Sequence, residues 1–193
     1  NASVTGNSLQ SGAFTFTGSS LGVNSGIILS TGSIFNAIGP NNVGNKSTNF
    51  GGPGHPLLTN LAGYPTNDAA MLKFDFEVQS DKIEFNFVFL SEEYNEWVNT
   101  GFNDVFAFYI SGPGINGEEN LAVVPGTTTP VSINTINSNS FWQFYRDNTN
   151  NNTNIQFDGF TTLMKAQKSG LIPCSTYTLK LMIADGTDYI YDA

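Results

Sequence analysis

The chain has 193 residues, with 16 acidic against 7 basic residues and a formal net charge of −9. This length suffices for one domain with a sizeable core, and no linker or charge block divides it, so we expect a single domain over residues 1–193. Such an acidic protein is a poor partner for nucleic acid and for anionic membrane surfaces. The chain has no run of about 18 apolar residues, which is the length that would predict insertion into a membrane. Hard cations and hydroxyl-rich ligands fit this composition better.

In chain order, the clearest signal is alternation of apolar and polar residues with a period of two. It is strongest at 72–78, 83–89 and 177–184, which predicts half-buried strands. The short segment 79–81 is typical of a compact turn, so the first two strands are expected to form an antiparallel hairpin. Further strands are predicted at residues 14–17, 27–29, 105–110, 121–124, 131–136, 141–145 and 155–157.

Helical patterns are weak, with short candidates at 68–71 and 161–167 only. Many short strands separated by Gly, Pro and Asn turns predict an all-β fold, an antiparallel β-sandwich of the jelly-roll kind with long loops. The segment 36–69 is too long for an ordinary connection, so we expect it to be functional or mobile. The polar run 148–154 predicts a loop tip.

The single Cys174 and the single His55 exclude several kinds of site. One cysteine cannot form an internal disulfide, and together with one histidine it cannot build a zinc site. We expect Cys174 to be a small buried side chain and His55 to be an ordinary loop residue. The chain has no phosphate loop, and its single histidine lies in a Gly-Pro loop, so a Ser-His-Asp triad is not expected.

Acidic residues gather directly after two of the apolar strands. The sequence Glu-Glu-Tyr-Asn-Glu at 92–96 follows the strand at 83–89, with Asn103 and Asp104 a few residues on. Asp-Gly-Thr-Asp at 185–188 follows the strand at 177–184. If those strands are neighbours in one sheet, their ends meet at one rim. Carboxylates so placed repel one another and lose hydration unless a positive group is present.

A calcium ion is the positive partner that we predict, because basic residues are few. Calcium takes about six to eight oxygen ligands from carboxylates, amides and carbonyls in irregular loops dense in Asp, Asn and Gly. The predicted ligands of Ca²⁺ are Glu92, Glu93, Glu96, Asn103, Asp104, Asp185, Asp188 and Asp192.

Other interpretations of the same residues stay open at this level. Asp-Gly-Thr-Asp is also a common turn sequence, and the charge run at 92–96 is also typical of a solvated loop. The spacing is not that of an EF-hand, so any site is assembled from separate loops. Glu93 and Asp104 are also candidates for the acid and base of a glycosidase, although dense carboxylates without a basic neighbour favour ligands over a tuned pair.

Aromatic residues flank the acidic cluster in a polar loop. Aromatic faces stack on sugars or anchor peptides, so we predict that Tyr94, Trp97 and Asn99 contact a ligand. Trp142 and Phe144 are expected in the core, where aromatic residues are most frequent.

A series of motifs resembles the choice-of-anchor L domain, a module of bacterial secreted and surface proteins. The motifs include Phe-Val-Phe-Leu-Ser-Glu-Glu-Tyr at 87–94, Asn-Asp-Val-Phe-Ala-Phe at 103–108 and Phe-Asp-Gly-Phe-Thr at 157–161. Each is weak alone, but their number and order are specific, and the resemblance covers most of the chain from residue 26.

The resemblance implies an extracellular β-sandwich at the bacterial cell surface, within a large and often adhesive multidomain protein. We therefore expect a calcium-dependent adhesion module that binds an extracellular peptide or glycan and has no catalytic activity. The alternatives are a carbohydrate-active domain, either a binding module or a glycosidase, and a structural spacer. In the family, the pair Tyr191-Asp192 is followed by another apolar strand, so we expect either an open strand edge here or a strand supplied from elsewhere.

Overall fold

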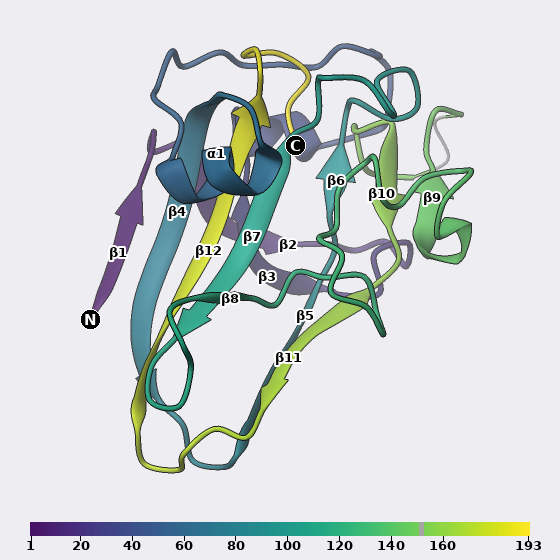
Figure 1. Ribbon diagram of the computed structural model, residues 1–193. Helices are drawn as coiled ribbons and strands as arrows, with labels where there is room; N and C mark the ends of the chain where they lie inside the picture. Colours follow the sequence, from purple (N-terminus) through teal and green to yellow (C-terminus); the bar gives the residue numbers. More distant parts are fainter. Residues whose placement is uncertain (151–152) are drawn as a thin grey trace.

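A computed structural model describes residues 1–150 and 153–193, and it is a β-sandwich. The main sheet has five antiparallel strands, with the long strand β12 at its centre (Figure 1). In spatial order these strands are β1 (Ala2–Thr5), β4 (Thr66–Glu77), β12 (Thr176–Gly186), β7 (Val105–Ser111) and β8 (Glu119–Asn120).

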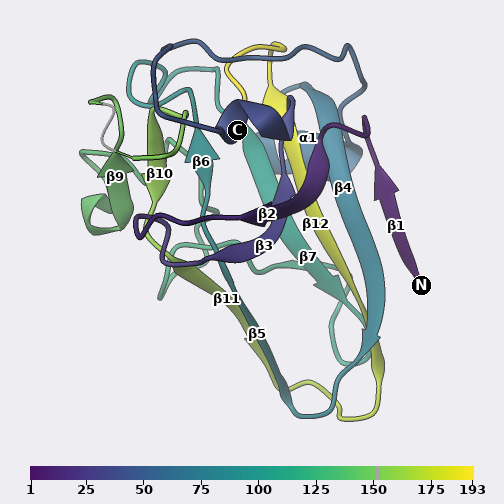
Figure 2. The same cartoon turned by 180° about the vertical axis from the view of Figure 1, so that it is seen from behind.

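The opposite layer is a bent ribbon together with a hairpin. In the ribbon, β5 pairs with β11, and the adjoining β6 and β9 pair with β10. Figure 2 shows the β2–β3 hairpin lying across the direction of β7 and β12. These elements are β2 (Ser11–Thr15), β3 (Ser25–Leu29), β5 (Lys82–Phe87), β6 (Leu90–Ser91), β9 (Tyr145–Asp147), β10 (Gly159–Thr161) and β11 (Met164–Ser169).

The apolar core lies between the two layers, because alternate residues of each strand point inward. Leu179 and Ile183 of β12 are buried there, and Phe89 stacks on Phe106 with ring centroids 4.6 Å apart. The outer face of the main sheet is covered by helix α1 (Pro56–Ala62), whose Leu58 is fully buried (Figure 1).

Helix α1 begins and ends with recognisable capping residues inside the 36–69 segment. His55 is its N-cap, with Nδ1 accepting a hydrogen bond from the Leu57 amide at 3.2 Å, and Pro56 occupies the first turn. Gly63 ends the helix at φ 82°. Within the described residues, 3₁₀ helices also occur at Ile34–Ala37 and Trp142–Phe144.

The predicted hairpin between 72–78 and 83–89 is wrong. Both strands exist, but β4 pairs with β1 and β12, whereas β5 pairs with β11 in the other layer. The turn between them therefore carries the chain from one layer to the other. The short helices expected at 68–71 and 161–167 are also wrong, because these residues belong to β4 and to β10 and β11.

Several predicted strands are not regular strands. Residues 121–124 and 155–157 contribute only isolated bridges, 131–136 form turns, and 141–145 are mostly the second 3₁₀ helix. Their apolar side chains are largely buried all the same, as Ile133 and Ile155 show. Alternation reports which side chains are buried and leaves the backbone pairing undetermined.

Three further expectations concern single residues or loops. Cys174 is exposed at a positive φ of 59°, and Trp142 is 68% exposed, so neither is a core residue. Cys174 lies in a turn, and Trp142 begins the second 3₁₀ helix. Part of the expected loop tip at 148–154 lies outside the described residues, while Asn148 is buried and donates to the Ile155 carbonyl at 2.8 Å.

Candidate functional site

The predicted rim is formed where β7 begins and β12 ends. Ala184 is the register partner of Val105, so Asp185 and Asp104, the next residues outward, are neighbours across the two strands. The Gly186 amide donates to Oδ1 of Asp104 at 3.0 Å. The strands that meet here are thus β7 and β12, whereas the expected pairing of the strands at 83–89 and 177–184 in one sheet is wrong, because β5 lies in the other layer.

Glu93 reaches the same rim from the opposite layer. It lies in the turn after β6, and its Oε2 accepts a hydrogen bond from the Asp104 amide at 2.9 Å. The turn is shaped by Ser91, whose Oγ accepts from the Glu93 amide at 3.0 Å. Three carboxylates from distant parts of the sequence therefore converge.

These side chains are buried, and some of their polar atoms have no hydrogen-bond partner among the described residues. Asp104 and Asp185 are 0% exposed and Glu93 is 1% exposed. Oδ2 of Asp104, both carboxylate oxygens of Asp185 and Oδ1 of Asn103 are buried without a hydrogen-bond partner among the described residues. A buried oxygen in this state costs free energy unless a proton or a cation satisfies it.

The titration of the three carboxyls reflects this burial. Loss of hydration raises the pKa of Glu93 to about 8 and that of Asp185 to about 9, and it holds the pKa of Asp104 well above its usual range. Mutual repulsion adds to the effect, because the charges of Glu93 and Asp185 raise the pKa of Asp104. None of the ion pairs among the described residues includes these groups.

The long 36–69 segment supplies donors to the neighbouring carboxylates. The Lys46 amide donates to Oε1 of Glu92 at 2.8 Å, and the Thr48 amide donates to Oδ1 of Asp192 at 3.1 Å. The Phe50 amide donates to Asp68 at 2.8 Å. Figure 1 shows this segment arching over the top of the sandwich beside the yellow chain end. Its length therefore serves to cover the acidic rim.

Of the eight predicted metal ligands, the structure places six at the rim and two outside it. Glu92 and Asp192 contact each other, since the Glu92 amide donates to the Asp192 carbonyl at 3.1 Å. Both adjoin the central group, because Glu92 directly precedes Glu93 and the charge of Asp192 raises the pKa of Asp185. Glu96 is exposed, and Asp188 is half-buried with Oδ1 accepting from the Ile190 amide at 3.2 Å. The four in the central group are Glu93, Asn103, Asp104 and Asp185.

The three predicted ligand contacts lie in different environments. Tyr94 is fully buried, and its hydroxyl donates to the Ile136 carbonyl at 2.8 Å, so it is a core residue that does not face a ligand. Trp97 is half-buried and packs edge-on against Tyr191, with ring centroids 5.5 Å apart. Asn99 is exposed at a positive φ of 63°.

Sequence reasoning missed Asp68 and the amides that cap it. Asp68 is 1% exposed within β4, and the Gly52 amide also donates to its Oδ1. The expected helix at 68–71 hid the position of Asp68 at the start of a strand, next to the apolar residues 69–72. Tyr64 was missed as well, and its hydroxyl accepts from Nδ2 of Asn103 at 3.1 Å.

The acidic side chains alone do not complete a metal site. Among the described residues, no group of three or more His, Cys, Asp or Glu side chains is arranged to hold a metal ion. The buried oxygens without partners among the described residues come from Asn103, Asp104 and Asp185, and Oε2 of Glu92 is in the same state. This mixed set of carboxylate and amide oxygens is of the kind that calcium accepts.

A family model described as the choice-of-anchor L domain matches residues 1–193. Neither the curated proteins nor the solved structures include a match to this chain. Within the described residues, no helix is long and apolar enough to cross a membrane.

Proposed function

The chain belongs to the choice-of-anchor L family, whose name denotes secreted or surface-associated proteins, and we propose that it is a calcium-dependent recognition module without catalytic activity. In this proposal the module belongs to a larger bacterial surface protein and binds an extracellular peptide or glycan. The calcium ion sits at the rim and holds the loops in place for recognition.

The observation that carries the proposal is the set of buried oxygens without partners. Oδ1 of Asn103, Oδ2 of Asp104 and both carboxylate oxygens of Asp185 come from adjacent strands at one rim. All are hard donors, with no sulfur or imidazole among them, which favours calcium over zinc or copper. An irregular set that includes an amide oxygen also suits calcium better than the strict octahedron of magnesium.

The remaining rim residues fit roles as supports. Glu93 accepts from the Asp104 amide, and the Gly186 amide holds the other oxygen of Asp104, so the free Oδ2 is fixed in direction. Glu92 and Asp192 are capped by the 36–69 segment. When calcium binds, protons held by the buried carboxyls are released, because calcium competes with them for the same oxygens.

A non-catalytic role is favoured by the burial of the carboxylates. A glycosidase needs two carboxyl groups flanking the scissile bond of a sugar, with one group reaching water. Glu93 and Asp104 are 1% and 0% exposed, and Oε2 of Glu93 is bonded to the Asp104 backbone. The exposed ligand contacts would come from the adjoining loop, where Trp97 and Asn99 lie.

The metal component is tested by thermal unfolding with calcium, with magnesium and with chelator. A hundredfold excess of calcium over Kd should add about 2.7 kcal/mol to the free energy of unfolding. Asp104→Asn and Asp185→Asn should weaken calcium binding by at least about tenfold in calorimetry, since each removes a ligand charge. Asp81→Asn, at the exposed turn after β4, is the matched control and should bind as the parent does.

Equal unfolding midpoints with calcium and with chelator would remove the metal from the proposal. Equal calcium affinity in all three variants would remove the rim assignment while leaving a metal elsewhere. Recognition is tested separately by screening immobilised glycans and peptides with the parent and with Trp97→Ala, in calcium and in chelator. Retention that depends neither on calcium nor on Trp97 would contradict the recognition surface.

A further inference from the structure

A large apolar cavity lies between the inner face of the main sheet, strand β5 and the β2–β3 hairpin. Its volume is about 930 Å³, within the range of sites that bind ligands. The floor is made by inward-facing residues of β4, β7 and β12, and the wall by β5. Residues central to the lining are Phe74, Ile83, Phe85, Phe108, Leu179 and Leu181.

The residues around this cavity are less covered than sandwich interiors normally are. Leu181 lies on the central strand of the main sheet and points inward, yet it is only half-buried, and so is Phe108 on the neighbouring strand. At the mouth, Ile27, Phe35 and Ile38 are 60%, 61% and 67% exposed. Inward-facing apolar residues in a packed sandwich are ordinarily covered by the opposite sheet, so this part of the core lacks its cover.

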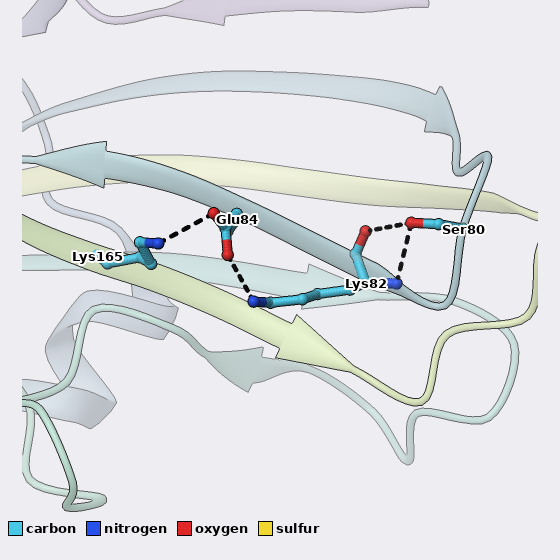
Figure 3. A network of polar contacts seen from close by, with 4 residues as sticks. All are labelled: Ser80, Lys82, Glu84 and Lys165. Carbon is cyan, nitrogen blue, oxygen red and sulfur yellow. Dashed lines mark hydrogen bonds and ion pairs between the residues drawn. The ribbon is translucent and has the colours of Figure 1, made fainter.

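Strand β5 has its backbone paired on one side only. Among the described residues it pairs with β11 and with no other strand, so its other edge borders the cavity. The outward face of the ribbon is polar: Glu84 contacts Lys82 at 2.5 Å and Lys165 at 3.0 Å (Figure 3). The alternate residues Ile83 and Phe85 therefore face the cavity, beside unpaired backbone groups.

We propose that this groove binds an extended polypeptide strand with alternating apolar side chains, which adds to the free edge of β5. Backbone amides and carbonyls of the incoming strand would pair with β5, and its apolar side chains would cover the floor. The six residues of β5 set the length of the paired segment, about 20 Å at about 3.4 Å per residue. The occupant is a segment of a partner polypeptide.

Two other occupants fit the same features less well. A fatty acyl chain would cover the apolar floor but offers no donors or acceptors to the edge of β5, whose polar groups would stay unsatisfied next to apolar surface. A second copy of this chain would bring another net charge of −9 toward the first, which opposes association at low salt. The chemistry of the groove, an apolar floor beside a bare strand edge, favours a neutral or basic extended peptide.

This inference rests on the recognition role proposed above but needs neither calcium nor the rim. The probe is a blocked octapeptide of alternating Thr and Val, measured by calorimetry in calcium and again in chelator. Binding in both conditions supports the groove even if calcium proves absent from the rim. Binding should protect alternate amides of residues 82–87 against hydrogen exchange, because the amides that point away from β11 become newly paired.

Two methylated peptides make the test specific for strand pairing. In one, all Thr amides are N-methylated, and in the other all Val amides are, so that each peptide loses the donors of a single edge. One of the two should bind at least about tenfold more weakly than the unmodified peptide, and the other should bind nearly as well. Equal binding of all three would overturn the proposal, because burial of side chains alone would then explain it.

Two variants that add a charge, one at the mouth of the groove and one away from it, test where the peptide binds. Ile27→Glu places a charge in the apolar mouth and should weaken peptide binding by about tenfold. Ile172→Glu is the matched control, because Ile172 is 50% exposed and lies outside the cavity lining. Neither change affects a buried residue, so both variants should fold. Tight binding of laurate without peptide binding, or dimerisation abolished by Ile27→Glu, would replace the peptide by an acyl chain or a second copy and would overturn the proposal.

Discussion

The Gly186 amide donates to Oδ1 of Asp104 at 3.0 Å and so joins the end of β12 to the start of β7. The contact is possible because Gly186 has no side chain. A Cβ built on Gly186 would lie 2.3 Å from the carbonyl oxygen of Asn103, which is far closer than such atoms approach. The rim thus depends on a close backbone approach next to the proposed calcium ligands.

Gly186→Ala should therefore destabilise the protein. The added methyl group meets backbone, which cannot swing away as a flexible side chain can, so a cost of about 1–3 kcal/mol in the free energy of unfolding is expected. Gly101→Ala is the control, since no atom lies within 4 Å of a Cβ placed there. Denaturant unfolding of both variants checks the prediction, and equal midpoints would contradict the close approach.

The stability of the calcium-free protein should fall as the pH rises from about 5 to about 9. The pKa of Glu93 is raised from 4.5 to about 8 and that of Asp185 from 3.8 to about 9, both through burial. In that window the folded state holds more protons than the unfolded chain, so the free energy of unfolding decreases with pH. Melting in chelator across this range measures the slope.

Calcium should oppose this loss of stability at high pH. The ion binds the deprotonated carboxylates, so the difference in melting temperature between calcium and chelator should widen as the pH rises. A calcium-free melting temperature that stays constant or rises between about pH 5 and about pH 8 would contradict the raised pKa values. In that case the buried carboxyls would have other partners.

The strands were more predictable from the sequence than their partners. Alternation located β4, β5 and β12 well, because side chains on one face of a strand must be apolar wherever that face is buried. It could not tell whether the turn at 79–81 joins neighbours in one sheet or crosses to the other layer, since both connections bury the same residues. Pairing depends on long-range contacts, such as that between β4 and β12.

The acidic site, too, was predictable from the sequence only in part. Asp104 and Asp185 were predictable because carboxylates beside apolar strands lose hydration and repel one another unless a positive group is present. The amides of Lys46 and Thr48 were not, because backbone donors are present at every residue and leave no mark on the sequence. Glu96 lies only three residues from Glu93 and is nevertheless exposed, since the turn that buries one carboxylate points the other to water.

Two leucine truncations should distinguish filled from unfilled parts of the core. Leu58 is fully buried under α1, so Leu58→Ala should cost about 2–5 kcal/mol. Leu181 is half-buried beside the existing cavity, so Leu181→Ala should cost only about 1 kcal/mol, because fewer contacts are lost. Chemical unfolding measures both, and equal costs would mean that the groove is packed in solution.

Trp97 should report calcium binding by its fluorescence. Its ring packs against Phe102 and Tyr191, which directly precede the rim residues Asn103 and Asp192. An ion that orders the rim must therefore shift the packing around the indole. The chain has two tryptophans, and the other, Trp142, is 68% exposed.

The variant Trp142→Phe leaves Trp97 as the sole tryptophan and should show a saturable change in emission on calcium addition. The midpoint should equal the Kd from calorimetry, because both report the same ion. Trp97→Phe is the control and should show no such change, although its calcium affinity should stay close to that of the parent. A calcium response that follows Trp142 instead would place the ion away from the rim, since the exposed indole lies on the second 3₁₀ helix, outside the turn that carries Glu93.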